Sequence, residues 1–352
     1  MKAWRIHEHG GPEVLKRVEV ADPIPGPMEV RVRVQAVGLN HLDVWARKGV
    51  PGFKFPLPLI PGCDICGVID SFGPGSEKAL AKEGLIQGSD VILNPVVSCD
   101  RCEACLGGFQ PLCKSFGILG ETQDGGCADY VIAPLSQVIA PPAGLDLAEA
   151  AALPIPFVTA WTMVTRKAQI KPGQWVLVQA GGSGVSVALI QMIKLLGANV
   201  ITTVGDDSKI QKAHDLGADF VIQYKSQSFK EELKKIFVQI GRKGCDIAFD
   251  HVGASSFQDS MRALAWGGKF VTCGATSGAE VSLDLKALFF KNISVLGSTM
   301  GSKADLIQVL ELVKQKKLHG VVDTVLPMEK LPEALARLED RRVFGKIVVT
   351  NS

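Results

Sequence analysis

The sequence predicts an α/β protein in which a β-rich region precedes a doubly wound parallel sheet. Short apolar runs separated by Gly and Pro dominate residues 1–140, whereas strand and helix patterns alternate after about residue 148. A small-residue turn at 181–184 joins the first strand of the alternating region to a helix. Such alternation indicates crossover helices on both faces of a parallel sheet. The two patterns therefore predict two domains of different architecture.

Composition and charge exclude several classes of protein. Of the 352 residues, 47% are hydrophobic and 21% are charged, which is typical of a soluble globular chain with a large core. The formal net charge is only +2 and no long basic run occurs, so neither nucleic acid nor an anionic membrane is expected as a partner. The opening residues lack the apolar core of a signal peptide, and no apolar stretch is long enough to span a bilayer. We expect a cytoplasmic protein.

The predicted elements follow the chain in order. Strands are expected in the β-rich region at 29–37, 68–72, 90–93 and 129–132. In the alternating region they are expected at 175–179, 200–204, 220–222, 246–250, 269–273 and 293–296, with helices between the successive strands. Two amphipathic helices near 304–316 and 331–338, and a strand at 346–350, complete the pattern.

Four of the nine cysteines form a compact motif, C-x2-C-x2-C-x7-C, in a polar loop. They are Cys99, Cys102, Cys105 and Cys113. Four thiolates can close a tetrahedral site around one zinc ion, and a site without an open position is structural. An iron–sulfur cluster is the alternative metal centre. Because the loop has little apolar content, a bound metal would supply the energy that orders it.

The small-residue turn is the candidate nucleotide site. Gly181, Gly182, Ser183 and Gly184 follow an apolar strand, and Val185 begins a helical pattern. Small side chains let the backbone N–H groups and the positive helix end approach an anionic pyrophosphate. An ordinary connection between a strand and a helix is the alternative interpretation.

Together these features resemble the medium-chain dehydrogenase/reductase family. The matching motifs are GGPEVL at 10–15, GLNHLD at 38–43, the cysteine lobe, the glycine turn and FGKIVV at 344–349. The resemblance implies a chaperonin-10-like (GroES-like) catalytic domain at 1–152 and 299–352, with the zinc lobe at about 95–115. It implies a Rossmann dinucleotide-binding domain at 153–298. It also implies a homodimer or homotetramer that assembles through the sheet edge near 293–297.

The resemblance further implies a catalytic site without metal. Zinc-dependent alcohol dehydrogenases of this family hold a catalytic zinc with residues whose places are taken here by Asn40, Cys63 and about Ile155. A thiol and an amide cannot form the three-ligand open site that such chemistry needs, and Leu42 replaces the hydroxyl that relays the proton. The pattern is similar to the quinone-oxidoreductase and enoyl-reductase branches of the family. A carbonyl, enone or quinone would then accept a hydride directly from the nicotinamide.

Several residues are assigned to the reaction centre by position. The candidates are Asn40, His41, Asp43, Cys63 and Asp64, and His41 should also lie near the cofactor phosphates. His41, Asp64, Cys63 and water are the candidate proton donors. The alternative for His41 and Asp43 is a structural role in which they cap and tie their loop.

The C-x-x-C pair formed by Cys63 and Cys66 has three interpretations. It is a redox pair, a metal site completed by Cys127, or two small buried packing residues, and we favour packing because free cysteines are often buried.

Two rival functions of the whole protein stay open. One is an alcohol dehydrogenase with an altered catalytic zinc, and the other is a catalytically degenerate NADPH sensor.

The expected cofactor is NADPH, with NADH as the alternative. The second strand of the alternating region ends at Val204 without the acidic residue that binds the adenosine ribose in NAD enzymes. Lys209 is placed to meet a 2′-phosphate and Tyr224 to pack near the adenine, whereas Asp206 and Asp207 favour NADH. Ser183 and Ser186 stand where relatives commonly have Gly. The remaining candidate cofactor residues are Thr159, Cys273, Gly274 and Ser298.

Overall fold

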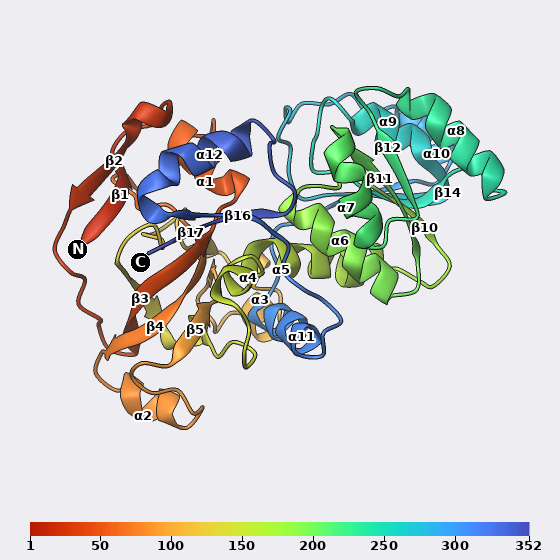
Figure 1. Cartoon of the computed structure of the whole chain (residues 1–352). Helices are drawn as coiled ribbons and strands as arrows, with labels where there is room; N and C mark the ends of the chain where they lie inside the picture. The colour runs from red at the N-terminus through yellow and green to blue at the C-terminus, as the bar shows by residue number, and fades with distance from the viewer. Residues whose placement is uncertain (352) are drawn as a thin grey trace. The chain divides into compact units, whose positions relative to one another are not determined.

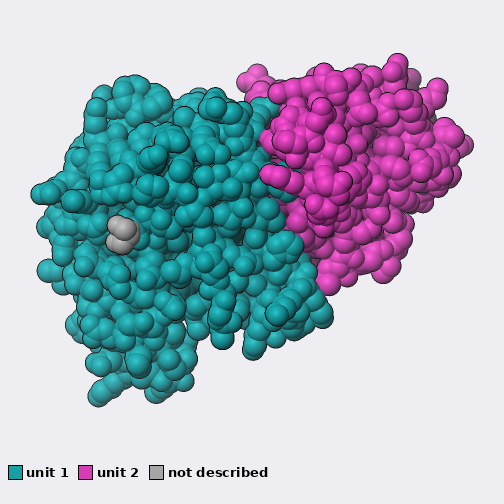
Figure 2. Space-filling view, in the orientation of Figure 1, with its two compact units in different colours: residues 1–158, 301–352 teal, residues 159–300 magenta. Residues whose placement is uncertain are grey.

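The computed structural model describes residues 1–351 (Figure 1). Two compact units are present: unit 1 comprises Met1–Val158 and Gly301–Ser352, and unit 2 comprises Thr159–Met300 (Figure 2). The chain therefore leaves unit 1, forms unit 2 and then returns to unit 1. Within residues 1–351, no helix is both long and apolar enough to cross a lipid bilayer.

Unit 1 is built on a seven-stranded mixed sheet. Its strands run in the order β16-β17-β3-β4-β5-β9, and β8 also pairs with β3. The bounds are β3 (Glu29–Gly38), β4 (Asp64–Phe72), β5 (Asp90–Leu93), β8 (Tyr130–Pro134), β9 (Val138–Ile139), β16 (Val322–Pro327) and β17 (Lys346–Thr350). Two further two-stranded sheets pair β1 (Lys2–Ile6) with β2 (Leu15–Glu19), and β6 (Val96–Val97) with β7 (Gly117–Ile118). β17 pairs antiparallel with β3, so a late segment completes a sheet that begins near the N-terminus.

The helices of unit 1 are short and lie between these strands in the sequence. They are α1 (His41–Lys48), α2 (Ser76–Ala81), α3 (Glu103–Leu106), α4 (Leu147–Ala151), α11 (Lys303–Lys314) and α12 (Leu331–Glu339). α5 (Pro154–Thr162) begins in unit 1 and ends in unit 2. Leu331 and Leu335 of α12 are almost fully buried, as the amphipathic pattern of this helix predicts.

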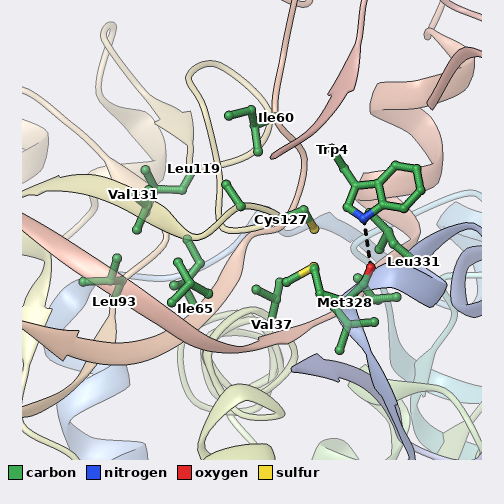
Figure 3. Packing of buried hydrophobic residues seen from close by; sticks show 14 of the residues in the cluster. Trp4, Val37, Ile60, Ile65, Leu93, Leu119, Cys127, Val131, Met328 and Leu331 are labelled. Carbon is green, nitrogen blue, oxygen red and sulfur yellow. Dashed lines mark hydrogen bonds between the residues drawn. The ribbon is translucent and has the colours of Figure 1, made fainter. Parts of the chain in front are cut away.

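The core of unit 1 brings together segments that are far apart in the sequence (Figure 3). Trp4 packs among these residues, and its indole Nε1 donates a hydrogen bond of 2.8 Å to the carbonyl oxygen of Met328. A buried indole N–H needs such a partner, because its desolvation is otherwise uncompensated. This bond ties the first strand to the segment that precedes α12.

Unit 2 is a six-stranded parallel sheet in the order β12-β11-β10-β13-β14-β15. The strands are β10 (Trp175–Val178), β11 (Asn199–Val204), β12 (Phe220–Gln223), β13 (Cys245–Phe249), β14 (Leu264–Thr272) and β15 (Ser294–Gly297). The connecting helices are α6 (Gly184–Leu195), α7 (Ile210–Asp215), α8 (Phe229–Gln239), α9 (Phe257–Ala263) and α10 (Leu285–Phe290), and a π-helical segment spans Met163–Ala168. The strand order reverses between β10 and β13, which is where open α/β sheets bind ligands. This sheet confirms the predicted doubly wound fold.

Candidate functional site

A polar cluster lies in unit 1, at the start of α1, β4 and β17. Asn40 caps α1, Asp64 begins β4 and Lys346 begins β17. The ammonium Nζ of Lys346 lies 2.9 Å from Asp64 Oδ2 and donates to Asn40 Oδ1 at 2.7 Å. Asn40 Nδ2 donates to the same Asp64 oxygen at 2.9 Å. Each side chain of the cluster therefore holds the other two in place.

The Asp64 carboxylate is fully buried, and its charge is compensated. Its side chain is 0% exposed and that of Lys346 is 3% exposed. The second oxygen, Oδ1, accepts a hydrogen bond of 2.7 Å from the backbone N–H of Ile155. Both oxygens of Asp64 are therefore occupied by hydrogen-bond donors, and Asp64 fixes the orientation of Asn40 and Lys346. A buried carboxylate is tolerated only with partners of this kind.

Asp43 lies one turn into α1 and ties two loops together. Its Oδ2 accepts from the backbone N–H of Asn40 at 2.7 Å, and its Oδ1 accepts from that of Gly62 at 2.8 Å. Burial raises the pKa of Asp43 to about 6, and the two N–H donors and Lys346 oppose this shift. These contacts are those of the structural alternative for Asp43, in which it fixes the loop that carries Asn40.

α1 itself is anchored through its last turn. Arg47 is almost completely buried, and its guanidinium forms an ion pair with Glu339 of α12. Lys48 reaches the other oxygen of the same carboxylate at 2.6 Å. With Asp43 at one end and Arg47 at the other, the helix holds Asn40 in a fixed position.

Three buried cysteines lie near this cluster. Cys63, Cys66 and Cys127 are at most 1% exposed, and all are free thiols. Burial raises the pKa of each thiol well above its ordinary value, and for Cys63 the carboxylates of Asp43 and Asp64 add to the shift. Within residues 1–351, the cysteine lobe is the only group of three or more Cys, His or acidic side chains that are close enough to share a metal ion.

The four lobe cysteines converge on one point. All four sulfurs lie within 4.8 Å of one another. The Cys102–Cys105 and Cys99–Cys113 pairs are 3.5 Å apart, and the Cys99–Cys105 pair is 3.9 Å apart. Tetrahedral bonds of about 2.3 Å to zinc place sulfurs about 3.8 Å apart, which fits these values. An iron–sulfur cluster needs wider spacing because its cysteines bind different iron atoms.

The turn between β10 and α6 requires small residues. A Cβ on Gly181 would lie 2.4 Å from the hydroxyl oxygen of Thr202, and Ala180 adopts a left-handed backbone with φ of 52°. The Gly181 N–H donates to the carbonyl of Thr203 at 2.7 Å, which fixes the turn against β11. The first amides of α6, those of Gly184 and Val185, have no acceptor within their own helix. They form the positive end expected of an anion site.

The two serines of this turn contact a histidine that the sequence pattern did not single out. Ser183 is the N-cap of α6, and its Oγ accepts from the backbone N–H of Ser186 at 3.1 Å. His251 Nε2 lies 2.9 Å from Ser183 Oγ and 3.0 Å from Ser186 Oγ. Ser183 and Ser186, which stand where relatives commonly have glycine, therefore form one hydrogen-bonded group with His251.

The other candidate cofactor residues lie in several places in unit 2. The hydroxyl of Thr159 contacts Met300 Sδ at 3.8 Å. Lys209 Nζ lies 3.5 Å from Asp206 Oδ2, and a Cβ added at Gly205 would lie 2.9 Å from the Tyr224 hydroxyl. Cys273 and Gly274 follow β14, so Cys273 is half-buried just beyond the strand rather than within it as predicted. The Ser298 hydroxyl is buried without a hydrogen-bond partner among the described residues.

Comparisons with known proteins agree with this architecture. A family model described as "Zinc-binding dehydrogenase" matches residues 184–315, and one described as "Alcohol dehydrogenase GroES-like domain" matches residues 26–143. An alcohol dehydrogenase from Moraxella sp. (strain TAE123) is 30% identical over 349 residues, which cover 99% of each chain. The chain belongs to the medium-chain dehydrogenase/reductase family. The predicted resemblance is thereby confirmed.

Relatives within the medium-chain dehydrogenase/reductase family carry different names. Quinone oxidoreductase-like protein 2 of Mus musculus is 28% identical over 342 residues, which cover 94% of this chain and 87% of the relative. The crystal structure of an NAD-dependent alcohol dehydrogenase matches this chain with 45% sequence identity over 100% of both chains and a TM-score of 0.93. This medium-chain dehydrogenase/reductase is thus an NAD(P)-dependent oxidoreductase.

Three polar residues of this medium-chain dehydrogenase/reductase escaped the sequence analysis. Lys346 stands in the FGKIVV motif, but nothing in the sequence links it to Asp64. His251 follows β13 and gives no spacing signal with the turn. Glu121 is half-buried, and burial raises the pKa of its carboxyl to about 7. Only the three-dimensional structure identifies such residues, because the partners of Lys346 and His251 lie far away in the sequence and the burial of Glu121 results from packing.

Proposed function

We propose that this protein is an NADPH-preferring reductase that transfers a hydride to an activated C=C bond or to a quinone without a catalytic metal. The observation that carries the proposal is the Asn40–Asp64–Lys346 cluster. By the resemblance, Asn40 of this cluster stands where the alcohol dehydrogenases of the family have a ligand of their catalytic zinc. The Lys346 ammonium neutralises the Asp64 carboxylate, which would otherwise attract a metal ion.

The donor chemistry at the cluster disfavours zinc. Asn40 uses its amide oxygen to accept from Lys346 and its nitrogen to donate to Asp64. By the resemblance, the fully buried thiol of Cys63 would be the only sulfur ligand of such a site. A catalytic zinc needs three such ligands and an open position. The cluster offers instead a neutral, fixed polar surface.

The reaction then depends on binding and orientation. The nicotinamide supplies the hydride when the cofactor is bound. The turn at Gly181–Gly184 and the α6 amides hold the pyrophosphate, and Ser298, with its unpaired buried hydroxyl, contributes a polar contact. Thr159 supports the nicotinamide, and Asn40 is held in one orientation by Asp64 and Lys346. Orientation of the two reactants and exclusion of water supply most of the acceleration.

A proton must reach the oxygen of the reduced product. Of the candidate donors, Asp64 is fully hydrogen-bonded and Cys63 is buried with a raised pKa, which leaves His41 and water. His41 begins α1 directly after Asn40. A His41→Gln variant distinguishes the two: a strong fall in kcat with an altered pH profile assigns the proton to His41, and an unchanged kcat assigns it to water.

The test is a substrate panel run on one zinc-counted sample. Enones, quinones, aldehydes and alcohols are assayed with NADPH and with NADH. We expect one zinc per chain, NADPH-dependent reduction of an enone or quinone, and no immediate loss of activity with a chelator. Two zinc ions per chain, with alcohol oxidation that chelation abolishes, would establish the altered-zinc alcohol dehydrogenase instead. Tight NADPH binding without turnover of any compound would indicate a sensor.

A further inference from the structure

The hydrogen bonds around the glycine turn allow its protons to be assigned. The hydroxyl of Ser186 is fully buried and lies 2.8 Å from the carbonyl oxygen of Gln179. A carbonyl oxygen only accepts, so the single hydroxyl hydrogen of Ser186 is used in this bond. The Ser186 oxygen therefore meets His251 Nε2, 3.0 Å away, only as an acceptor.

The hydrogen between Ser186 and His251 must then belong to the ring. An unprotonated Nε2 would turn its lone pair toward the lone pair of Ser186 Oγ at 3.0 Å, which is repulsive. With a hydrogen on Nε2, the ring donates to both serine oxygens. Burial lowers the pKa of His251 and favours the neutral ring, which carries a single N–H. The ring also contacts the backbone of His251 itself, but the 3.0 Å contact with Ser186 Oγ favours Nε2 for this hydrogen.

This assignment determines which hydrogen bonds the Ser183 hydroxyl can form. Its oxygen accepts from the Ser186 backbone N–H at 3.1 Å and from His251 Nε2–H at 2.9 Å, so both of its lone pairs are occupied. The hydroxyl hydrogen of Ser183 is the one hydrogen of this group without an acceptor inside it. Ser183 is half-buried and immediately precedes the amides of Gly184 and Val185 at the start of α6.

We propose that the Ser183 hydroxyl is a fixed hydrogen-bond donor to the pyrophosphate of the dinucleotide, and that His251 is the positioning residue that enforces this orientation. The inference rests on the proposed function, because it needs a dinucleotide at this turn. A glycine at position 183 would give the ligand a close backbone and no such hydrogen. In this protein the serine side chain occupies that space and provides a charge-assisted hydrogen-bond donor that is oriented before the ligand binds.

The experiment measures binding rather than turnover, by calorimetry on the full chain. NADPH is compared with 2′-AMP, which carries the adenosine and the 2′-phosphate but lacks the pyrophosphate. Ser183→Ala is expected to weaken NADPH binding about tenfold or more and to change 2′-AMP binding less than about twofold. Ser183→Thr keeps the hydroxyl and is expected to restore affinity. Ser255→Ala, which removes an exposed hydroxyl of unit 2 outside the turn, serves as the matched control.

The role of His251 is tested with a double-mutant cycle. His251→Ala should weaken NADPH binding when Ser183 is present and have no further effect in the Ser183→Ala background. His251→Gln restores an N–H donor and should recover part of the loss. Equal NADPH affinity in Ser183→Ala and the parent protein overturns the inference, as does an equal loss of 2′-AMP binding. A parent protein that binds neither NADPH nor NADH would instead overturn the proposed function, and this inference with it.

Discussion

Lys346 is the residue on which the buried charge of Asp64 depends. Its ammonium lies 2.9 Å from the carboxylate, and both side chains are almost completely inaccessible to water. Removing one partner of a buried ion pair leaves the other charge uncompensated in a medium of low polarity. The pair therefore constrains stability as well as the geometry of Asn40.

Lys346→Gln should lower the free energy of unfolding by about 3–5 kcal/mol, because Asp64 loses its counter-ion. Urea titration at pH 7.5 measures the change. Lys194→Gln is a matched control, since Lys194 lies the same 2.9 Å from Asp219 but both side chains are about one-third exposed. That control should cost less than about 1 kcal/mol. Equal costs for the two variants would show that burial does not strengthen the Lys346 pair.

Asp43 gives the folded state a defined dependence on pH. Its pKa of about 6 lies above the ordinary value near 3.8, so between those values the folded chain holds a proton that the unfolded chain has released. Its contribution to stability is therefore complete below pH 4 and is lost as the pH rises through about 6. Asp43→Asn should remove this part of the pH dependence, as urea titrations at pH 4.5 and 7 would reveal. It should also cost about 1–3 kcal/mol, because one of two backbone N–H donors then loses its acceptor.

Lys209 determines the proposed preference for NADPH. Lys209→Gln should weaken NADPH binding by about tenfold or more and leave NADH binding nearly unchanged, because only NADPH carries a 2′-phosphate. Fluorescence titration with each cofactor measures this difference. Asp206→Asn is the control: it removes the neighbouring carboxylate, 3.5 Å from the ammonium, and should not weaken NADPH binding. Parallel losses for both cofactors in Lys209→Gln would contradict the assignment.

At the residue scale, the sequence identifies groups whose signal is local. Ser183 and Ser186 stand out because they replace expected glycines within a few positions of one another. Lys346 and His251 do not stand out in the sequence, because the role of each depends on a partner on another strand or turn. The burial that raises the pKa of Asp43 is likewise a property of the packed structure.

The cysteine lobe shows how one element depends on its metal. Removing zinc with a strong chelator, or replacing Cys102 with Ser, should abolish the expected one zinc per chain and make residues 99–113 sensitive to proteases. Metal analysis measures the loss of zinc, and limited proteolysis measures the protease sensitivity of residues 99–113. Cys245→Ala is the control, because Cys245 is buried in β13 outside the lobe and its loss should leave zinc in place. Iron in the parent protein would contradict the zinc assignment.

Strands and helices with strong periodicity were predictable, whereas strands with an interrupted apolar pattern were not. β5, β10, β11 and β17 lie within one residue of the predicted segments at each end. β1, β2 and β16 were missed because charged and small residues interrupt their apolar pattern, and pairing with neighbouring strands stabilises them instead. The same rule explains β4, whose first four residues lie before the predicted segment but are paired with β3.

At the scale of the whole molecule, one edge of unit 2 is unusually apolar for a surface. Trp266, Phe289 and Phe290 are 73%, 63% and 54% exposed, and Val295 lies on β15, the last strand of the parallel sheet. An open strand edge bordered by exposed aromatic side chains favours pairing with a second copy. We therefore expect a homodimer, or a tetramer that contains this dimer.

Val295→Lys should convert the assembly to monomers, because it places a charge on the pairing edge. Light scattering coupled to size-exclusion chromatography measures the mass. Val238→Lys is the control, since Val238 is 76% exposed on α8 and should leave the mass unchanged. A Val295→Lys protein that keeps the mass of the parent would place the interface elsewhere.

The antiparallel pairing of β17 with β3 also matters for how the protein is made. Asp64 and Lys346 are separated by 282 positions, with the whole of unit 2 between them. During translation, Asp64 therefore has no counter-ion until almost all of the described chain, including Lys346, has been synthesised. Unit 2 can fold earlier from its own contiguous segment, so nascent chains should acquire a nucleotide-binding fold before the polar cluster is assembled.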